Sequence, residues 1–507
     1  MVVSSPSMKR ELKKLLIANR GEIALRIIRS ARLFGLRTVA VFSEADAAST
    51  HVAAADEAIL IGPAEASKSY LDIAKIIDVA RQSGADAIHP GYGFLSERAE
   101  FARAAADAGI VFVGPRPEVM AALGDKVAAR RIAAEAGVPV VPGIETAEIS
   151  AAREFAKRVD YPILVKAAAG GGGRGMRVVT EAPQLESALQ AASHEAAAAF
   201  GDGRIFIEKY LARPRHIEVQ ILGDEDGGVV ALGERECSIQ RRHQKIVEES
   251  PAPGLSAPMR TKMIDAALSL ARAAKYTNAG TVEFLAEGDN FYFLEVNARL
   301  QVEHPVTEMR FGCDLVCEQL RIASGGKVPD PPAPRGAAIE CRINAEDPEH
   351  DFRPATGRVL HLNVPAGPGV RFDSHLAIGA EVTPWYDGLV GKLICFGADR
   401  EEARRRLVNA FAEFALLGVT NNAAYLRDIV ASEPFRDAKL STHFIEEFFG
   451  GWHPSDSEIT SALIAAAMTA NGAFGEERSA ADGSPSRTTN LSPWEILKNF
   501  ELWGSRR

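Results

Sequence analysis

Short apolar runs alternate with helical patterns over residues 14–113. The runs fall at about residues 14–18, 37–42, 58–61, 85–89 and 110–113. Between the first two runs, apolar positions recur at helical spacing, at Ile23, Ile27 and Ala31. Such alternation predicts a parallel sheet with helices on both faces. The first turn lacks G-x-G-x-x-G, which argues against a dinucleotide site.

Two glycine-rich segments follow predicted strands. His89–Glu97 lies after a strand end, where open α/β sheets place ligands, although a plain Gly/Pro turn is an equal alternative. A later strand, Pro162–Lys166, leads into Gly170–Gly175, and another strand begins at Met176. Four consecutive glycines at a hairpin tip leave backbone amides free to cradle phosphates, and Lys166 would add a point charge. A flexible linker is the alternative for this second segment.

Two stretches further along carry charge in different patterns. In Pro214–Leu222, strict alternation places His216, Glu218 and Gln220 on one side of a predicted strand. Gly233–Lys245 is rich in charge and has no helical spacing of apolar residues. It is either a solvated loop or a segment that faces an anion, and its many basic residues favour the anion.

The most informative pattern lies at Glu283–Glu303. Aromatic and aliphatic residues up to Leu294 indicate a buried strand. From Glu295 the chain alternates strictly, so one side of an extended ribbon would carry Glu295, Asn297, Arg299, Gln301 and Glu303. Carboxylate and amide oxygens suit Mg²⁺, the guanidinium suits a small oxyanion, and a nearby Glu could move a proton. This set favours a metal–phosphate site over a solvated amphipathic strand.

The rest of the chain divides at a proline-rich linker, Val328–Pro334, which follows a helical pattern from Asp314 to about Ser324. Beyond the linker, a mostly β unit is indicated by strands at 338–345, 357–360, 370–373 and 392–396 and by helices at 401–414 and 423–429. An Ala-rich helix is predicted at 459–469, before a Gly/Ser/Arg-rich stretch at 472–490 with the composition of disorder. The final Ser492–Trp503 is apolar enough to dock elsewhere, although a disordered appendix is an equal alternative.

Composition narrows the class of protein. The chain has 507 residues, enough for several domains, and its 47% hydrophobic and 25% charged residues are ordinary for a soluble globular protein. The net charge of −9 argues against a nucleic-acid partner. We expect no membrane span and no signal peptide, because the apolar runs are too short. Five Cys without paired zinc-type spacing predict reduced thiols in a cytoplasmic enzyme.

Five motifs occur together in one order. They are Leu16–Ala24, His89–Glu97, the Gly170–Gly175 loop, Glu295–Pro305 and Glu340–Glu346. Together they closely resemble biotin carboxylase, the ATP-grasp component of biotin-dependent carboxylases, over residues 12–450. The resemblance implies an α/β fold (α+β overall) in three domains: a Rossmann-like domain at 10–123, an ATP-grasp domain at 124–330 and a β-rich C-terminal domain at 331–450. A mobile glycine-rich lid would occupy about residues 140–210, and residues 451–507 would form a tail.

The same resemblance assigns a nucleotide site. By match to the family's motifs, ATP would be bound by Lys126, Lys166, Gly172, Gly173, Glu208, Lys209, Tyr210, Leu211, His216, Gln240, His243, Glu283 and Glu295. The glycines would close over the phosphates, and residues 208–211 would hold the adenine. Two Mg²⁺ (or Mn²⁺) would be held by Glu283, Glu295 and Asn297, which agrees with the oxygen-ligand interpretation above.

The implied reaction joins ATP, bicarbonate and biotin on a carrier protein to give carboxybiotin, ADP and phosphate. Bicarbonate and biotin would be bound by Lys245, Arg299, Gln301, Val302, Glu303 and Arg342, of which Lys245, Arg299, Glu303 and Arg342 would be catalytic. Glu303 resembles the base that deprotonates bicarbonate. Carboxyphosphate would then break into CO₂ and phosphate, the phosphate would remove the biotin N1′ proton, and Arg342 would stabilise the enolate.

Two departures from the family pattern stand out. Ala168 and Ala169 precede Gly170 where the family has a longer Gly run with Ser before it, and their Cβ atoms restrict the backbone of the lid. The metal-site run reads Val296-Asn-Ala-Arg299 instead of Met-Asn-Thr-Arg, with both changes on the apolar side. The first departure predicts an altered lid closure, and the second predicts little effect.

The resemblance also implies partners. No biotin-acceptor motif is present, so the carrier and the carboxyltransferase would be separate proteins, and Ser492–Trp503 loosely resembles the start of a bridging domain in acyl-CoA carboxylase α-subunits. A homodimer is expected, with Asp387 in the matching interface region. The acyl acceptor, whether acetyl-CoA, propionyl-CoA, another acyl-CoA or pyruvate, would be chosen by the transferase. Alternative functions are another ATP-grasp carboxylate ligase and a non-catalytic assembly subunit.

Overall fold

The computed structural model describes residues 10–146, 148–167, 177–200 and 205–455 of the chain. All the helices and strands named below belong to the first of two compact units, Met1–His453 and Pro454–Arg507. The predicted helix at 459–469 and the tail beyond it lie outside the described residues. Within the described ranges, none of the helices combines the length and the apolar character that crossing a membrane requires.

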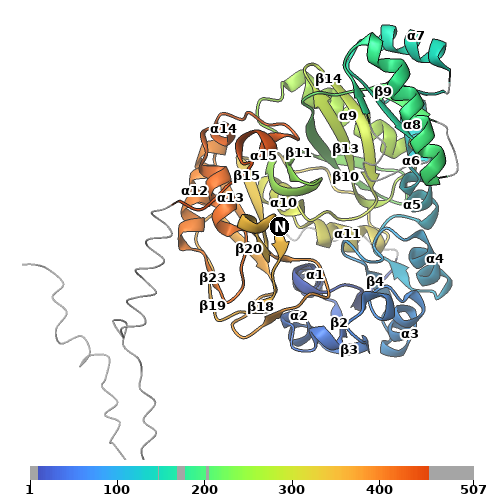
Figure 1. The fold of residues 1–507 in the computed structure, drawn as a ribbon. Helices are drawn as coiled ribbons and strands as arrows, with labels where there is room; N and C mark the ends of the chain where they lie inside the picture. The colour runs from blue at the N-terminus through green and yellow to red at the C-terminus, as the bar shows by residue number, and fades with distance from the viewer. Residues whose placement is uncertain (1–9, 147, 168–176, 201–204, 456–507) are drawn as a thin grey trace, which may run out of the picture. The chain divides into compact units, whose positions relative to one another are not determined.

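A five-stranded parallel sheet forms near the N-terminus (Figure 1). Its order is β3-β2-β1-β4-β5, from β1 (Lys14–Ile17), β2 (Arg37–Ser43), β3 (Glu57–Gly62), β4 (Ala87–His89) and β5 (Val111–Phe112). Leu15 and Ile17 pack against α1 (Gly21–Leu33) and α11 (Leu315–Ala323). Leu16 faces the other way, toward α3 (Ile73–Ser83) and α4 (Ala99–Asp107). The predicted parallel sheet with helices on both faces is confirmed.

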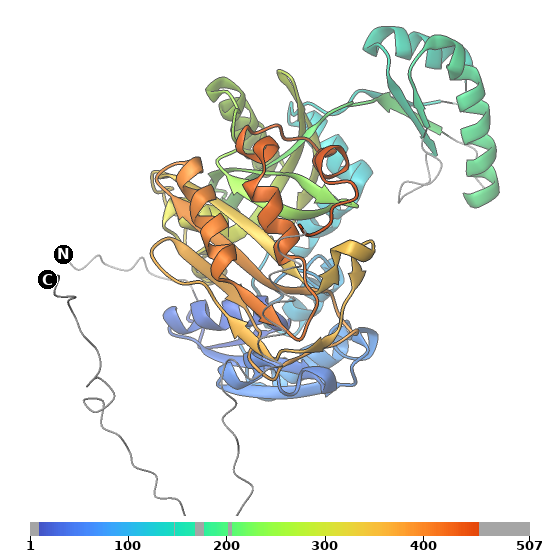
Figure 2. The same cartoon turned by 60° about the vertical axis from the view of Figure 1, so that its left-hand side comes forward.

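A four-stranded antiparallel sheet follows, in the order β6-β9-β7-β8. Its elements are β6 (Gly143–Glu145), α7 (Ile149–Val159), β7 (Ile163–Ala167), β8 (Arg177–Val179), α8 (Leu185–Phe200) and β9 (Ile205–Lys209). Both helices cover one face, where Phe155 and Leu189 meet Ile163 and Ile205 (Figure 2). The predicted strands that flank the glycine segment are thus present, while residues 168–176 lie outside the described ranges.

An eight-stranded antiparallel sheet forms the centre of the unit, in the order β14-β13-β10-β11-β12-β15-β22-β20. Its strands are β10 (Arg215–Gly223), β11 (Val229–Arg241), β12 (Gln244–Ser250), β13 (Asn278–Glu287), β14 (Asn290–Asn297), β15 (Ala337–Asn344), β20 (Val370–Ser374) and β22 (Leu389–Gly397). β12 precedes the proline-rich segment 328–334 and β15 follows it. Because these two strands pair, a single sheet contains strands from both sides of that segment.

One face of this sheet is apolar. Ile217, Val219 and Ile221 of β10 pack into a core with α5 (Pro117–Gly124), α6 (Lys126–Glu135) and α9 (Ala257–Ala273). Ile339 and Cys341 of β15 pack into a second core with α12 (Arg400–Glu413) and α13 (Ala423–Ala431), the two helices predicted at 401–414 and 423–429. By alternation the opposite face receives the polar side chains, so the predicted one-sided set His216, Glu218 and Gln220 is confirmed.

Short elements complete the unit. They are α2 (Thr50–Ala54), α10 (His304–Phe311), α14 (Glu433–Arg436), α15 (Phe444–Phe448) and three strand pairs, β16 (Glu346–Asp347) with β17 (Arg353–Pro354), β18 (Gly357–Arg358) with β21 (Glu381–Val382), and β19 (His361–Asn363) with β23 (Ala415–Leu417).

Two sequence interpretations are wrong in part. The charge-rich run Gly233–Lys245 is not a solvated loop, because it forms β11 and the start of β12, joined by a turn at Arg242 and His243. The extended ribbon predicted to reach Glu303 ends at Asn297, where β14 ends. The chain then turns into α10, whose start is set by Pro305, a residue suited to the first helical turn.

Candidate active site

Charged side chains of neighbouring strands meet on the polar face of the eight-stranded sheet. Glu218 on β10 pairs directly with Glu283 on β13 and with Arg235 on β11. Both carboxylates are buried. Two carboxylates opposite each other across antiparallel strands repel one another unless positive charge lies nearby. The register of the sheet therefore creates a demand for buried cations at this point.

Lys245 on β12 supplies one of these cations. Its Nζ lies 2.5 Å from Glu218 Oε2, 2.8 Å from Glu283 Oε1 and 2.7 Å from Glu303 Oε1. Burial opposes the charge, but the three carboxylates outweigh it and raise the pKa of Lys245 well above its ordinary value. The ammonium is thus fixed in place and charged, as a group that binds a substrate anion must be.

Glu303 is held between two cations. Beside its contact with Lys245, Oε2 lies 2.9 Å from a terminal nitrogen of Arg342. Burial opposes ionisation, but Lys245 and Arg342 outweigh it and hold the pKa of Glu303 well below its ordinary value. Arg342 also donates from Nε to Glu248 Oε1 at 2.6 Å, and burial raises the pKa of Glu248 to about 7 against the effect of Arg342. Glu248 was missed by sequence reasoning, because no local pattern distinguishes it from Glu249 beside it in the same strand.

Arg235 was also missed, and it is the most fully bonded side chain of the site. It is completely buried, and its Nε donates to Glu218. Its four terminal donors reach, at 2.8 to 3.1 Å, Gln220, Thr307, Thr281 and Gln301. All five N–H groups of the guanidinium are therefore used. Because Gln301 Oε1 accepts from Arg235, its Nε2 is turned to donate to Glu283 at 2.9 Å.

The loop after β14 adds the remaining predicted groups. Asn297 Nδ2 donates to Glu283 Oε1 at 2.8 Å, and Asn297 Oδ1 accepts from Arg299 at 2.9 Å. Arg299 Nε lies 3.0 Å from Oε1 of Glu97, which comes from the segment after β4. The glycine-rich segment His89–Glu97, singled out by its place after a strand, thus reaches this cluster. The structure brings Asn297, Arg299, Gln301 and Glu303 together although the chain there is not an extended ribbon.

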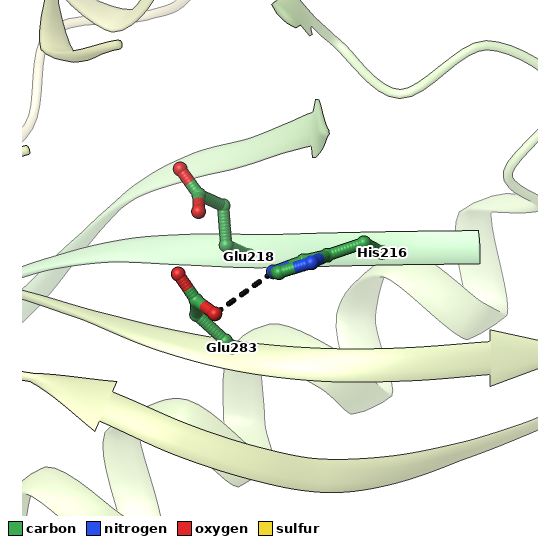
Figure 3. A group of neighbouring side chains, drawn as sticks. All are labelled: His216, Glu218 and Glu283. Atoms are coloured by element: carbon green, nitrogen blue, oxygen red, sulfur yellow. Dashed lines mark ion pairs between the residues drawn. The ribbon is translucent and has the colours of Figure 1, made fainter. Parts of the chain in front are cut away.

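His216 links the cluster to Gln240, another residue that the sequence predicted to bind the nucleotide. Its Nε2 lies 2.9 Å from Glu283 Oε2, and its Nδ1 accepts from Gln240 Nε2 at 2.8 Å. Figure 3 shows His216 and Glu218 on one strand and Glu283 on its neighbour, with the three side chains on the same face. A histidine with two carboxylates resembles a transition-metal site, but Glu218 is already paired with Arg235 and Lys245, and Lys245 also contacts Glu283.

A second possible metal group joins Cys237 to Glu218 and Glu303. Burial raises the pKa of the Cys237 thiol well above its ordinary value, so the sulfur stays protonated. A protonated thiol is a poor metal ligand, and Lys245 again holds both carboxylates. The oxygen set predicted from the sequence shares Glu283 with the first group and differs from it in Glu295, whose pKa is raised by burial and by Glu283.

The predicted set Glu283, Glu295 and Asn297 fits a hard cation. Glu295 on β14 pairs directly with Glu283 on β13, so the two carboxylates lie side by side. Burial and the charge of Glu283 raise the pKa of Glu295, and Lys126 only partly opposes them. Glu295 is thus a carboxylate short of positive charge, next to a second carboxylate and an amide. A divalent cation with oxygen ligands would relieve that imbalance.

The other predicted nucleotide residues are spread over several elements. Glu208 and Lys209 end β9, Tyr210 follows them, and Leu211 is buried. Lys209 Nζ donates to Val159 O at 2.8 Å. Lys126 is exposed at the start of α6, and His243 is exposed at the β11–β12 turn. Lys166 lies on β7, and Gly172 and Gly173 lie outside the described residues. Their roles in nucleotide binding stay predictions.

Three family models match consecutive parts of the chain. They are "Biotin carboxylase, N-terminal domain" at residues 11–120, "Carbamoyl-phosphate synthase L chain, ATP binding domain" at 125–330 and "Biotin carboxylase C-terminal domain" at 340–447. The middle model alone would also suit another ATP-grasp carboxylate ligase, which was an alternative above. The two flanking models do not share that ambiguity.

Individual relatives agree with the flanking models. A biotin carboxylase of Nostoc sp. is 50% identical over 442 residues, which cover 86% of this chain and 98% of that protein. The mitochondrial methylcrotonoyl-CoA carboxylase subunit alpha of Dictyostelium discoideum is 44% identical over 504 residues, covering 97% of this chain and 71% of that protein.

A solved structure is similar along the same length. The biotin carboxylase domain dimer of Hydrogenobacter thermophilus 2-oxoglutarate carboxylase, in complex with MgADP, ADP and bicarbonate, has a TM-score of 0.78 and 42% identity. The match covers 88% of this chain and 99% of that one. Three consecutive family models match, and the Nostoc biotin carboxylase is matched over 98% of its length. Together with the sheet of buried carboxylates and cations, these matches show that the chain belongs to the biotin carboxylase family of ATP-dependent ligases.

Proposed function

We propose that the cluster of Lys245, Glu303 and Arg342 is where this biotin carboxylase activates bicarbonate and carboxylates biotin. The observation that carries the proposal is the pair of cations on one buried carboxylate, with Glu303 at 2.7 Å from Lys245 and 2.9 Å from Arg342. A carboxylate so placed is ionised and can accept a proton. The two cations beside it, Lys245 and Arg342, can bind the anions that enter and leave the reaction.

Glu303 acts as the base in this proposal. Bicarbonate would be held by Lys245, Arg299, Gln301 and the backbone of Val302, and its oxygen would attack the γ-phosphate of ATP to form carboxyphosphate. In the free protein the two cations make Glu303 a weak base. When Lys245 or Arg342 turns part of its charge to a substrate anion, the pKa of Glu303 rises and proton transfer becomes easier. Substrate binding would therefore make Glu303 a stronger base.

The nucleotide and the metal ions would occupy the neighbouring region. Glu283, Glu295 and Asn297 would hold two Mg²⁺ (or Mn²⁺), which neutralise the charge of the phosphates when bound. His216 and Gln240 would help to place the nucleotide, because His216 contacts Glu283 and Gln240 donates to His216. The adenine would lie against residues 208–211. The related structure from H. thermophilus is a complex with MgADP, ADP and bicarbonate, which supports this choice of ligands.

Arg342 would serve the second half of the reaction. Carboxyphosphate would break into CO₂ and phosphate, the phosphate would take the N1′ proton of biotin, and the guanidinium would stabilise the resulting enolate by charge-assisted hydrogen bonds. Glu248 accepts a hydrogen bond from Nε of Arg342 and so fixes the direction of that N–H group. The strands β12 and β15 that carry these two side chains are paired, which supports a rigid placement of the guanidinium.

The assembly belongs to the same proposal. Biotin would arrive on a separate carrier protein, a carboxyltransferase would complete the reaction, and the chain would form a homodimer in the cytoplasm. The dimer of the related structure supports the homodimer, and the alignment of the D. discoideum subunit across 97% of this chain supports a role as a carboxylase subunit. We also propose the domain division at 10–123, 124–330 and 331–450, with the lid at about 140–210 and a partner-docking segment at 451–507.

The first experiment measures ATP hydrolysis with Mg²⁺ and bicarbonate, with and without free biotin. We expect strong stimulation by biotin and its loss, by about 100-fold or more, in Glu303→Gln and Arg342→Ala. Glu249→Gln is the matched control, because Glu249 is a buried carboxylate of β12 paired with Arg400 outside the cluster. Wild-type hydrolysis indifferent to biotin would favour another ATP-grasp ligase, and nucleotide binding without turnover would favour an assembly subunit.

A further inference from the structure

Lys392 is a buried cation for which the reaction proposed above has no role. It lies on β22, opposite Arg342 of β15, and its side chain is completely buried. Its Nζ donates to the carbonyl oxygen of Val302 at 2.9 Å and lies 3.2 Å from Glu22 Oε1. A buried ammonium is unfavourable unless it is paired and hydrogen-bonded. We therefore ask what these two contacts of Lys392 do for the site.

The contact with Val302 fixes the peptide that precedes Glu303. Among the described residues only Tyr161–Pro162 and Ser250–Pro251 are cis, so the peptide between Val302 and Glu303 is trans. In a trans peptide the N–H points opposite to the carbonyl. Lys392 therefore aims the N–H of Glu303 away from itself. The neighbouring carbonyl of Gln301 is fixed as well, because it lies 2.8 Å from His304 Nδ1. Both carbonyls of the turn before α10 are thus held.

Glu22 holds Lys392 in position. It lies in the first turn of α1, where the helix dipole favours a carboxylate, and it is buried. Neither of its oxygens has a hydrogen-bond partner among the described residues, which leaves the ion pair with Lys392 as its close contact. The contact at 3.2 Å thus places Nζ of Lys392 between Glu22 of α1 and the carbonyl oxygen of Val302. The N-terminal sheet domain reaches the catalytic turn through this pair.

We infer that Lys392 and Glu22 are positioning residues for bicarbonate activation, in which Lys392 orients the Val302–Glu303 peptide and Glu22 fixes Lys392. The inference rests on the proposed role of Glu303 as the base. Because Lys392 acts through the bicarbonate side of the site, its loss should affect bicarbonate and leave ATP binding unchanged. Because Glu22 acts through Lys392, its loss should matter only while Lys392 is present.

The test compares Lys392→Met, Lys392→Arg, Glu22→Gln and the double variant Lys392→Met/Glu22→Gln. In biotin-dependent ATP hydrolysis we expect Lys392→Met to lower kcat/KM for bicarbonate by about 30-fold, with KM for ATP within about twofold of wild type. Lys392→Arg, which keeps the charge and the donors, should recover part of the loss. Glu22→Gln should cost about fivefold alone and nothing further in the Lys392→Met background.

Glu249→Gln is again the control, and thermal unfolding of each variant separates loss of fold from loss of positioning. Equal losses toward ATP and bicarbonate, or additive effects of the two changes, would overturn the inference. If Lys392→Met does not fold, Glu22→Gln decides alone, and an unchanged kcat/KM for bicarbonate overturns it. A wild type without biotin stimulation, or an active Glu303→Gln, would refute the proposed function instead.

Discussion

Arg235 and Arg242 stand seven positions apart in the same charge-rich run, and they end in opposite environments. Arg235 is 0% exposed and pairs with Glu218, also 0% exposed. Arg242 is 66% exposed and pairs with Asp351, which is 80% exposed, at 2.7 Å. Both pairs are short contacts between the same kinds of group. The two pairs differ in their exposure to water. Water screens the electrostatic attraction of the exposed pair, whereas the attraction of the buried pair is screened much less.

The comparison shows where pairing has consequences. Arg242 joins the β11–β12 turn to a neighbouring loop, and water would replace either partner at little expense. Water could not replace Arg235 in this way, because five side chains around it accept hydrogen bonds from its donors. It sets the amide of Gln301 and neutralises Glu218, so the shape of the site depends on it. Charge density alone is a poor guide to a site unless burial accompanies it.

The largest effect should follow from removing the buried cation. We expect Arg235→Met to lower the free energy of unfolding by about 3–5 kcal/mol, because Glu218 then stays buried without its main counter-charge. Arg242→Met is the matched control and should change it by about 0–1 kcal/mol. Denaturant unfolding at pH 7 measures both. Similar values for the two variants would mean that burial does not distinguish these pairs.

His89 tests the converse case, a buried group kept neutral. Burial lowers its pKa to about 4, although Gln319 opposes the shift. The folded pKa lies below the ordinary 6.5, so the unfolded chain takes up the proton first as pH falls. Stability that is present above about pH 6.5 should be lost as pH falls through about 4, by about 3 kcal/mol. His51 and His375, with pKa values lowered by burial to about 4 and about 3, add to the same window.

The measurement for His89 is a series of urea unfolding curves between pH 7 and pH 4. Wild type and His89→Asn are compared by the slope of the unfolding free energy against pH, so any constant loss in the variant cancels. The variant should show a shallower decline than wild type. Parallel slopes would contradict a neutral, buried His89.

Glu295 is an intermediate case, a partly buried carboxylate short of positive charge. We expect Glu295→Gln to raise the Mg²⁺ concentration required for half-maximal ATP hydrolysis by about 10–100-fold, because a neutral amide binds a hard cation more weakly. Glu295→Asp should lie between the variant and wild type. A magnesium titration checks this, with Glu249→Gln as control. An unchanged titration would remove Glu295 from the proposed metal ligands.

Leu211 should show the smallest effect, because its contact is apolar and made by one side chain. We expect Leu211→Ala to raise KM for ATP about fivefold and to leave kcat and KM for bicarbonate near wild type. Steady-state kinetics with ATP and bicarbonate varied in turn measures this. A fall in kcat of similar size would place Leu211 closer to the reacting groups than the adenine assignment allows.

Periodicity was enough to predict much of the fold. The apolar runs between residues 14 and 113 became the parallel strands, and the one-sided set of β10 follows from a period of two. Prediction was weaker where long-range contacts decide the backbone. Strict alternation past Asn297 suggested a strand, yet the chain turns there. Lys392, 90 residues further along the chain, holds the carbonyl of Val302 in that turn.

The sequence by itself determined which kinds of side chain the site has and which family the chain resembles, because motifs and alternation are local properties. Only the tertiary structure decided that Arg235 and Glu248 are buried among the charged side chains of the cluster while Arg242 is exposed to water. That choice depends on the register of β10, β11, β12 and β13, which pairs residues far apart in the chain. The physical reason is that burial and counter-charge are properties of neighbours in space, and nothing local to Arg235 distinguishes it from Arg242.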